Sequence, residues 1–422
     1  MPHLTISGRR ERIPPFPHHK VFVHRSRRFF FARSAWDHLT LGRGIALKEM
    51  ARGLWHRCFI PRVLLIDPTS RCNLHCTGCW AADYGRGDEL SYGMLDSILS
   101  QAEALGIEEC MMSGGEPMLR KDDVLKLAAK HRRTIFGLYT NGTLVDETFV
   151  DGMARLGNLN LFLSIEGWRE ETDFRRGEGT FDRVVAAMDL LKSRDIGFGF
   201  STCYHAKNWD VATSDAFLDF LREKGAWFGW LFQYVPVGSG ADLSLVCPPE
   251  QRAEVKRRVE DYGRRHDFVL VDFWNTGHLV FGCAGAGTGF VHVNAHGDVE
   301  PCAFCHYSDS NLHDMTLVEA LRSPFFRRFR KAQPFDANPL RGCPLMNHPD
   351  ELAEVVRESG AHSTHLGAPE SPEELGAKTK PVDAAWRPVA ERVAAAEPAG
   401  RKRHFATMLR LLRWKKGWTD PR

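Results

Sequence analysis

Three cysteines within eight positions are the first side chains in this 422-residue chain whose spacing indicates chemistry. Cys72, Cys76 and Cys79 lie in the stretch TSRCNLHCTGCW, directly after an apolar run and a proline. Zinc would need a fourth ligand, and His75 lies nearby but in an awkward place between two cysteines. A redox dithiol would use Cys76 and Cys79 alone. A four-iron cluster accounts for all three thiolates, because one of its irons stays free for a small ligand.

The composition indicates a soluble globular protein, with 43% hydrophobic and 26% charged residues. No apolar run approaches the roughly 20 residues that span a bilayer, and the N-terminus lacks the apolar core of a signal peptide. We therefore expect a cytoplasmic protein. Eleven cysteines, an odd number in a chain without a secretion signal, fit metal ligands better than a disulfide framework.

The net charge of +3 conceals basic ends on an acidic body. Residues 1–62 carry 13 Lys and Arg against 3 Asp and Glu, and residues 399–422 carry 8 against 1, which leaves the body at −14. Basic ends that also contain aromatic residues fit the surface of an anionic membrane, to which the protein would bind peripherally. The alternative is that the two ends form solvated or self-docking helices.

The cysteine loop follows the first of six short apolar runs that alternate with amphipathic helical patterns. The expected strands are 62–67, 110–113, 134–139, 159–166, 197–204 and 227–234. The expected helices lie near 91–105, 122–131, 146–156, 180–194 and 213–223. This alternation predicts an α/β fold of parallel strands joined by right-handed crossovers, a partial (β/α)6 TIM-like barrel. Its chemistry would lie at the C-terminal ends of the strands, where the cysteine loop falls.

The cysteine spacing resembles the signature of the radical S-adenosylmethionine (SAM) enzymes. In that family the open iron of a [4Fe-4S] cluster binds SAM, and reduction cleaves SAM to methionine and a 5′-deoxyadenosyl radical. The resemblance therefore implies that Cys72, Cys76 and Cys79 hold the cluster. Family members usually have an aromatic residue before the third cysteine, whereas this chain has Gly78 there and Trp80 after it.

Residues that follow later strands support the resemblance. The stretch after the second expected strand resembles the family's GGEP motif, whose backbone and carboxylate hold the amino group of SAM. Residues after the third and fourth strands lie where the family contacts SAM, and two of them, Ser164 and Glu166, could bond the ribose hydroxyls; turn and cap roles are the alternative. The implied SAM-binding residues are Gly114, Gly115, Glu116, Pro117, Thr140, Asn141, Ser164 and Glu166.

Arg176 lies in an RGxGxF-like segment that is common in the subgroup with additional clusters. The resemblance gives Arg176 a carboxylate of SAM or substrate as its partner, and a structural ion pair is the alternative. Arg176 and Glu116 are the two predicted catalytic residues. Tyr204, Gln233 and Tyr234 end the fifth and sixth expected strands and either face the pocket or simply pack.

A second group of cysteines follows an expected helix at 250–265. The C-x13-G-x4-C spacing around Gly297 resembles a SPASM or Twitch-type domain, in which a hairpin that turns on the glycine brings cysteines together. The resemblance implies one auxiliary [4Fe-4S] cluster, although a structural zinc site has the same spacing. Cys305 could instead pack inward, which would leave His306, another side chain or an open site as the fourth position. The expected ligands are Cys283, Cys302, Cys305 and Cys343. The remaining cysteines are interpreted as small hydrophobes: Cys58, Cys110, Cys203 and Cys247.

The resemblance divides the chain into four parts. These are a basic, aromatic extension (1–61), the radical SAM partial barrel (62–245), a linker helix with a small α+β auxiliary cluster domain (246–350), and a Pro/Ala-rich linker with a basic amphipathic tail (351–422). Within the last part, residues 367–399 are rich in Pro, Ala, Glu and Lys and are expected to form a mobile linker.

The predicted function is an oxygen-sensitive radical SAM oxidoreductase or transferase. Its cofactors would be SAM, the SAM-binding [4Fe-4S] cluster and an auxiliary [4Fe-4S] cluster, and its reductant a flavodoxin or ferredoxin. The expected substrate is a peptide, as in relatives with this auxiliary region, or a lipid or other membrane-associated molecule that would suit the basic ends. The alternatives are a non-catalytic iron–sulfur carrier or scaffold, and an RNA-modifying radical SAM enzyme whose basic ends bind phosphates.

Overall fold

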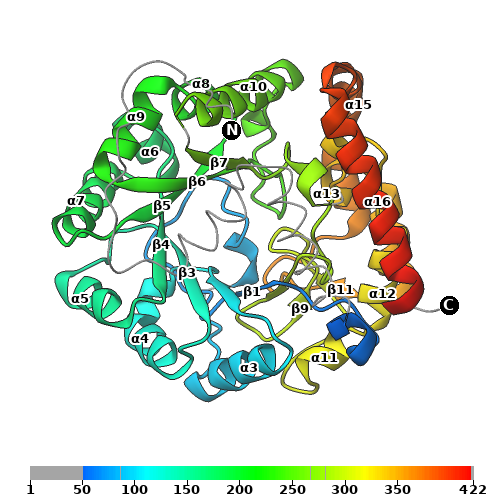
Figure 1. The fold of residues 1–422 in the computed structure, drawn as a ribbon, viewed down its shortest axis with the longest axis horizontal. Coiled ribbons are helices and arrows are strands. Elements are labelled where there is room, and N and C mark those ends of the chain that lie inside the picture. The colour runs from blue at the N-terminus through cyan, green and yellow to red at the C-terminus, as the bar shows by residue number, and fades with distance from the viewer. Residues whose placement is uncertain (1–50, 86, 267, 281, 420–422) are drawn as a thin grey trace, which may run out of the picture.

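A curved, mostly parallel sheet forms the centre of the molecule (Figure 1). The computed structural model describes residues 51–85, 87–266, 268–280 and 282–419. The first six strands are β1 (Val63–Ile66), β2 (Glu109–Met112), β3 (Ile135–Thr140), β4 (Leu159–Ser164), β5 (Phe198–Tyr204) and β6 (Ala226–Gln233). They pair in parallel in chain order. The helices between them are α3 (Tyr92–Ala104), α4 (Lys121–Lys130), α5 (Glu147–Leu156), α6 (Arg169–Arg176), α7 (Thr180–Ser193), α8 (Trp209–Ala212) and α9 (Asp215–Lys224).

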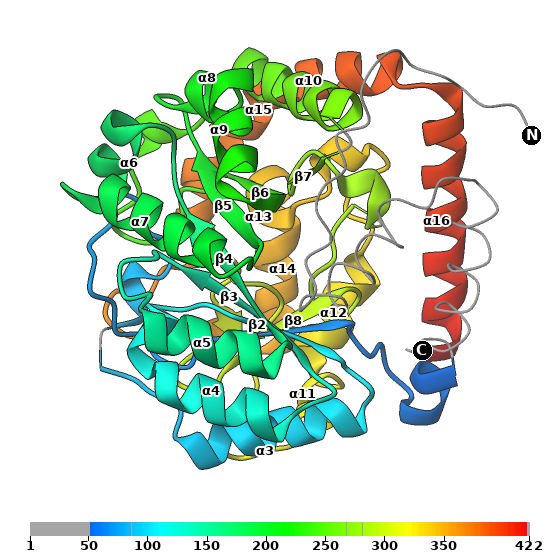
Figure 2. The same ribbon diagram turned by 60° about the vertical axis from the view of Figure 1, so that its left-hand side comes forward.

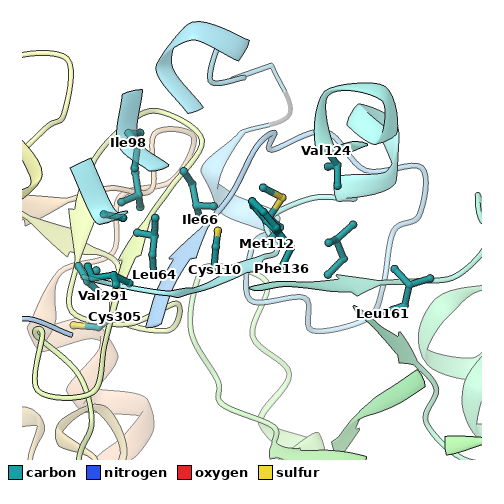
Figure 3. Close-up of a cluster of buried hydrophobic side chains, with 14 of the residues drawn as sticks. Leu64, Ile66, Ile98, Cys110, Met112, Val124, Phe136, Leu161, Val291 and Cys305 are labelled. Atoms are coloured by element: carbon teal, nitrogen blue, oxygen red, sulfur yellow. The ribbon is translucent and has the colours of Figure 1, made fainter. Parts of the chain in front are cut away.

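Alternate side chains of the strands pack on opposite faces of the sheet. Leu64 and Ile66 of β1 face outward, where they share a buried cluster with Ile98 of α3 and Val124 of α4 (Figure 3). Inward-facing residues form a separate cluster, to which β2 contributes Met111. Because both faces of the parallel strands are covered, their sequences are nearly continuous apolar runs.

The sheet is extended at both edges and does not close. β7 (Val269–Asp272) pairs with β6 at one edge, while β8 (Phe290–Val293) pairs in parallel with β1 and carries β9 (Val299–Glu300) antiparallel at the other. The predicted partial barrel is confirmed. The pairing of β8 with β1 was not expected, since it joins the cysteine-rich region directly to the barrel sheet.

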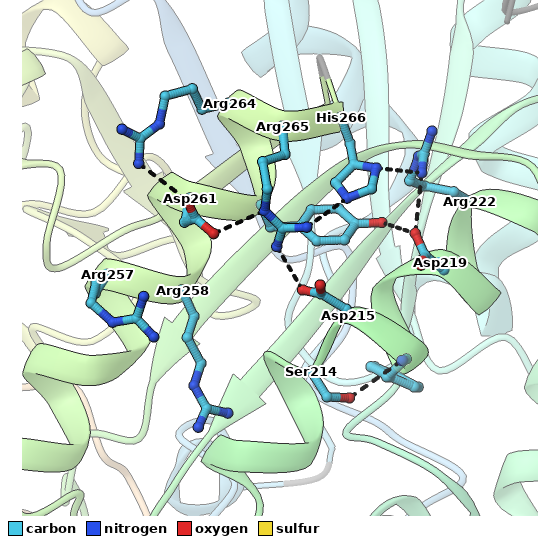
Figure 4. A network of polar contacts seen from close by, with 12 residues as sticks. Ser214, Asp215, Asp219, Arg222, Arg257, Arg258, Asp261, Arg264, Arg265 and His266 are labelled. Atoms are coloured by element: carbon cyan, nitrogen blue, oxygen red, sulfur yellow. Dashed lines mark hydrogen bonds and ion pairs between the residues drawn. The ribbon is translucent and has the colours of Figure 1, made fainter. Parts of the chain in front are cut away.

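The expected helix after the barrel is α10 (Pro249–His266). An ion pair joins it to α9: Arg265 lies 2.8 Å from Asp215 (Figure 4). Within α9, Arg222 lies 3.1 Å from Asp219. The Tyr262 hydroxyl of α10 also donates to Asp219, at 2.7 Å. Exposed pairs of this kind contribute little stability each, so their main effect is to set the position of α10.

The C-terminal third adds short elements around the second group of cysteines and two long helices. The short elements are β10 (Tyr307–Ser308), β11 (His362–Ser363), α11 (Leu317–Ala320), α12 (Pro324–Ala332), α13 (Pro344–Asn347) and α14 (Pro349–Ser359). The long helices are α15 (Pro372–Ala396) and α16 (Ala399–Thr419), which lie outside the sheet (Figures 1 and 2).

The mobile linker predicted for residues 367–399 is wrong, because most of that segment is α15. A capping box of Ser371 and Glu374 begins the helix. Buried residues then recur on one face from Leu375 to Ala390. Among them Trp386 donates from Nε1 to the carbonyl oxygen of Leu340, at 3.0 Å. The Pro, Ala, Glu and Lys content suggested disorder, but Ala, Glu and Lys are also strong helix formers, and one indole provides a large buried area.

Replacing Trp386 by alanine is expected to lower the free energy of unfolding by about 3–5 kcal/mol, the usual cost of removing a buried aromatic side chain. Urea denaturation of the full chain measures it. Trp414→Ala on α16 is the matched control, since its side chain is 50% exposed and its loss should have little effect. Equal midpoints for the two variants would contradict the docking of α15.

The basic ends are described only in part. Residues 1–50 of the predicted N-terminal extension lie outside the described residues. The predicted basic tail forms α16, which buries Phe405 and Leu412 and leaves Leu411 half exposed. Within the described ranges, no helix combines the length and the apolarity that a bilayer crossing requires.

Candidate active site

The cysteine loop, which carries Cys72, Cys76 and Cys79, lies beside the glycine loop, which contains Gly114 and Gly115. The two loops follow the C-terminal ends of β1 and β2. The amide of Gly115 donates to the carbonyl oxygen of Thr69 at 2.9 Å, and the amide of Glu116 donates to that of Arg71 at 2.8 Å. A Cβ atom at position 115 would lie 2.0 Å from the Arg71 oxygen, so only glycine fits. The structure thus brings the two sequence motifs together through their backbones.

The three cysteines of this loop are free and partly buried. Burial, and to a smaller extent the nearby Glu116 carboxylate and the thiols of Cys76 and Cys79, raise the pKa of Cys72 to about 11. In the described part of the chain, no three Cys, His, Asp or Glu side chains converge closely enough for a single metal ion. A set that consists of thiolates alone is the ligand type that iron–sulfur clusters use.

Glu116 is buried and its carboxylate is already occupied by the protein. Oε1 accepts from the amide of Met118 at 2.9 Å and the hydroxyl of Thr140 at 2.7 Å, and Oε2 accepts from the amide of Asn141 at 2.8 Å. Burial raises the pKa of this carboxyl, against the effect of the hydrogen bonds. Glu116 therefore ties the ends of β2 and β3 together. Its contact with the amino group of SAM stays a prediction.

Other predicted residues stabilise the same loops. Asn141 donates from Nδ2 to Asn73 Oδ1, at 2.9 Å, and so links the end of β3 to the cysteine loop. Pro117 is buried and begins the 3-10 helix Pro117–Arg120. Gly114 adopts a φ of +96°, a conformation that favours glycine. Ser164 is the last residue of β4 and is buried.

Glu166, just past β4, forms a buried ion-pair cluster with two arginines of α6. Its Oε1 lies 2.7 Å from Arg175 Nη1 and 2.6 Å from Arg176 Nη2, and its Oε2 accepts from the amide of Cys203 at 2.8 Å. Burial alone would raise the pKa of Glu166, but the two guanidinium groups outweigh it and hold the pKa low. These contacts occupy both oxygens, so the ribose contact stays a prediction.

Arg176 joins this cluster to the cysteine loop. Its Nη1 lies 4.0 Å from Cys76 Sγ, and the amide of Thr77 donates to the carbonyl oxygen of Arg175 at 2.8 Å. The structure therefore shows the structural ion pair that was the alternative role for Arg176, and places the same side chain beside Cys76, a predicted cluster ligand.

Sequence reasoning missed Arg175 and Cys203. Arg175 lies nine residues after Glu166. The sequence does carry a signal for both arginines, because Arg175 and Arg176 are adjacent at the end of the helix that follows Glu166. Cys203, interpreted as a small hydrophobe, is only partly buried. The guanidinium of Arg175 counteracts the burial that raises the pKa of its thiol. Cys58, Cys110 and Cys247 are buried as expected.

Gly78, where the family usually has an aromatic residue, packs against the ring of Tyr234. Gly78 has a φ of +64°, and a Cβ atom there would lie 2.5 Å from Tyr234 Cε2. The amide of Asp242 donates to the Tyr234 hydroxyl at 2.9 Å and fixes the ring. An aromatic ring from the residue after β6 thus occupies the space next to this loop position.

A buried charge triad joins the barrel to the auxiliary region. His292 of β8 lies with Nε2 3.0 Å from Asp67 Oδ2 and with Nδ1 2.7 Å from Glu300 Oε2. Tyr84 and Thr364 donate hydroxyls to the same glutamate. Burial alone would lower the pKa of His292, but the two carboxylates outweigh it and raise the pKa to about 10. His292 is therefore an imidazolium at neutral pH.

We expect this triad to make stability fall in alkaline solution. The pKa of His292 is about 10 in the folded chain and about 6.5 when unfolded, so its stabilisation is complete below about pH 6.5 and is lost as the pH rises toward 10. Melting temperatures between about pH 8 and pH 10 should decline more steeply for the parent than for His292→Gln. His296→Gln, at a half-exposed position, should keep the parent's slope. Parallel slopes for all three would contradict the triad.

The second group of cysteines gathers around the β8–β9 hairpin. The hairpin turns at Gly297, which has a φ of +93°, as predicted. The amide of Cys305 donates to the carbonyl oxygen of Cys302 at 3.0 Å. Burial raises the pKa of both thiols, and the thiols of Cys283 and Cys343 raise it further. Four neighbouring thiols fit one [4Fe-4S] cluster, and the structure keeps Cys305 among them.

Aromatic side chains connect the two groups of cysteines. Trp80, directly after Cys79, lies with its ring centre 5.8 Å from that of Phe304 and 6.0 Å from that of His306. The regions that carry the two groups of cysteines therefore pack against each other.

Comparison with known proteins agrees with this geometry. The model of the Radical SAM superfamily matches residues 66–214, and that of the SPASM iron-sulfur cluster-binding domain matches residues 283–344. An AdoMet-dependent heme synthase of Methanosarcina barkeri is 26% identical over 300 residues, covering 64% of this chain and 85% of the relative. A PqqA peptide cyclase of Gluconobacter oxydans is 29% identical over 306 residues, covering 67% and 82%.

Solved structures share the fold. Streptococcus suis SuiB bound to S-adenosylmethionine aligns with a TM-score of 0.55 at 18% identity, over 71% of this chain and 76% of SuiB. The enzyme anSMEcpe with bound AdoMet and a peptide aligns with a TM-score of 0.56 at 19% identity, over 79% and 99%. The chain therefore belongs to the radical SAM superfamily, as an enzyme that uses a [4Fe-4S] cluster and SAM and carries a C-terminal SPASM domain for auxiliary iron–sulfur chemistry.

Proposed function

We propose that this enzyme uses SAM to abstract a hydrogen atom from a peptide. A cluster held by Cys72, Cys76 and Cys79 would supply the one electron that cleaves SAM to methionine and a 5′-deoxyadenosyl radical, and this radical would take a hydrogen atom from the substrate to give 5′-deoxyadenosine. The observation that carries the proposal is the backbone contact between the cysteine loop and the loop of Gly114 and Gly115. This contact supports the proposal because the predicted cluster ligands and the residues predicted to hold the methionine end of SAM lie in the two loops that it joins.

Each predicted residue has a place in this scheme. Cys72, Cys76 and Cys79 would bind the cluster, and Arg176 Nη1 lies 4.0 Å from Cys76 Sγ. Glu116 fixes the glycine loop on β3 through its hydrogen bonds. The remaining contacts of SAM would come from the strand ends: Gly114, Gly115, Pro117, Thr140, Asn141, Ser164 and Glu166.

The peptide substrate is supported by what the relatives act on. One relative is a PqqA peptide cyclase, and SuiB has been solved bound to its precursor peptide SuiA. The peptide would enter on the side of β5, β6 and β7, because the SAM-binding residues occupy the ends of β1 to β4.

A heme-type substrate is the second candidate, and the inner face of the sheet favours it. Partly buried rings on this face contact one another from β3 to the SPASM domain. The ring centre of Phe232 lies 6.0 Å from that of Tyr139, 5.6 Å from that of Phe273 and 6.4 Å from that of Phe304. An array of aromatic rings suits a flat apolar ligand. Relatives with such names include the heme synthase and a pre-heme d1 synthase of Dinoroseobacter shibae.

The test is anaerobic. The reconstituted enzyme is mixed with SAM and dithionite, and 5′-deoxyadenosine is quantified beside a Cys76→Ala variant. We expect formation by the parent only, because loss of one thiolate removes the cluster that SAM binds. A parent that holds a reducible cluster but forms none would overturn the proposal. Deuterium transfer to 5′-deoxyadenosine from a deuterated peptide or a deuterated heme precursor then separates the two substrates.

Membrane association, the reductant and the compartment stay proposals. The basic ends support binding to anionic lipid, and an enzyme that does not pellet with anionic liposomes at low salt would overturn that proposal. A flavodoxin or ferredoxin that replaces dithionite in the 5′-deoxyadenosine assay would identify the reductant. An RNA substrate would co-purify with the protein and be released at high salt.

A further inference from the structure

Arg252 of α10 is a buried cation close to the auxiliary cysteines. Only 2% of its surface is exposed. Its Nε donates to Asn275 Oδ1 at 3.0 Å, and its Nη2 donates to the carbonyl oxygens of Trp274 at 3.4 Å and Leu340 at 3.1 Å. The ring centre of Trp386 lies 4.0 Å from the guanidinium carbon. All of these partners are neutral.

Within the described residues, no carboxylate lies at ion-pair distance from Arg252. The nearest link to a negative charge runs through Asn275, whose Nδ2 donates to Asp272 Oδ2 at 2.6 Å. That carboxyl is itself buried, and burial raises its pKa to about 6. A desolvated guanidinium with only an indirect partner is costly, so a further anion in its surroundings would be strongly favoured.

The auxiliary cysteines lie on the side where that anion would be. Leu340, which accepts a hydrogen bond from Arg252, lies three residues before Cys343. Burial raises the pKa of Cys343, and Arg252 is among the groups that counteract this effect, together with a hydrogen bond from the Trp274 side chain. Trp274 therefore contacts both Arg252 and Cys343, and Leu340 connects Arg252 to Cys343 through three residues of backbone.

The helix α15 closes this region from outside. Trp386 covers the guanidinium and donates to the Leu340 carbonyl. Asp383, one turn earlier, binds Arg341 Nη2 at 3.0 Å and Asn347 Nδ2 at 2.8 Å, on either side of Cys343. The loop that carries Cys343 is thus held between α10 and α15, away from water, where charges act over longer distances.

The structure assigns Arg252 as the counter-charge of the auxiliary cluster held by Cys283, Cys302, Cys305 and Cys343, where it raises the reduction potential. A cluster with four thiolate ligands is an anion, and reduction adds a further negative charge. A fixed cation nearby stabilises the reduced form more than the oxidised form, and net charge and burial are main determinants of such potentials. The inference rests on the SPASM cluster alone and holds whatever the substrate is.

The test uses the full chain with Cys72, Cys76 and Cys79 replaced by alanine, so that only the auxiliary cluster gives an EPR signal. Arg252→Gln removes the charge and keeps donors, and Arg252→Lys keeps the charge. At the solution potential that half-reduces the parent cluster, we expect Arg252→Gln to lower the ratio of reduced to oxidised cluster roughly tenfold or more. Arg252→Lys should stay near the parent's ratio.

An unchanged ratio in Arg252→Gln at full iron content would overturn the inference. If Arg252→Gln does not retain the cluster, the result for Arg252→Lys decides. An Arg252→Lys variant that keeps the cluster at the parent's potential supports a charge effect. An Arg252→Lys variant that also loses the cluster shows that Arg252 acts through packing, which overturns the inference. Because the SAM-binding cluster is absent from this background, failure here is distinct from failure of SAM cleavage.

Discussion

Replacing Gly115 by alanine is expected to lower 5′-deoxyadenosine formation by about a hundredfold or more, since displacements of about 1 Å at a reaction centre have effects of this size. The added Cβ would lie 2.0 Å from the carbonyl oxygen of Arg71, 2.4 Å from its carbon and 2.6 Å from the carbonyl oxygen of Ser70. All three are backbone atoms that lead into the cysteine loop. Relief of the clash must move that loop away from the glycine loop.

Gly240→Ala is the matched control for this variant. Gly240 is exposed, and a Cβ atom there meets nothing within 4 Å. The measurements are 5′-deoxyadenosine formation and the change that SAM causes in the EPR signal of the reduced cluster. Parent-like values for Gly115→Ala would show that the two loops do not touch in solution as they do in the structure.

Glu166→Gln is expected to lower the free energy of unfolding by about 3–5 kcal/mol, the range for removing one partner of a buried ion pair. The substitution keeps the size of the side chain but leaves the guanidinium groups of Arg175 and Arg176 without a negative partner, in a site where Glu166 is fully buried. Because Arg176 also reaches Cys76, the variant should bind less iron at the cysteine loop.

An exposed ion pair nearby provides the control. Asp182 pairs with Arg169 across α6 and α7, and both side chains are more than half exposed. Asp182→Asn is expected to leave stability and iron content unchanged, because solvent screens such pairs. Urea denaturation and iron analysis are the readouts. A Glu166→Gln variant as stable as Asp182→Asn would mean that the buried cluster contributes nothing.

The sequence predicted those features that depend on local pattern. The six barrel strands could be located because each is a β-rich apolar run followed by a polar loop. The cysteine and GGEP stretches could be placed at one edge of the sheet, because C-terminal ends of parallel strands meet there. The turn at Gly297 was predictable because a hairpin needs a residue that tolerates positive φ.

Features that depend on contacts between distant segments could not be predicted. α6 has one apolar residue among eight, so its sequence shows no buried face, although Arg175 is buried by pairing with Glu166. α15 gains its order from Trp386 and Asp383, whose partners lie more than 30 residues away. The role of His292 was invisible because its two carboxylates come from the barrel and from β9.

The pairing of β8 with β1 has a consequence for how the chain can be divided. A fragment that ends before residue 283 would leave β1 as an edge strand, with unpaired amide and carbonyl groups and apolar side chains on both faces. Such an edge favours association with other chains. The SPASM domain thus covers the open edge of the barrel sheet in addition to its role in binding an iron–sulfur cluster. We expect that the two domains must be expressed as one chain in order to fold.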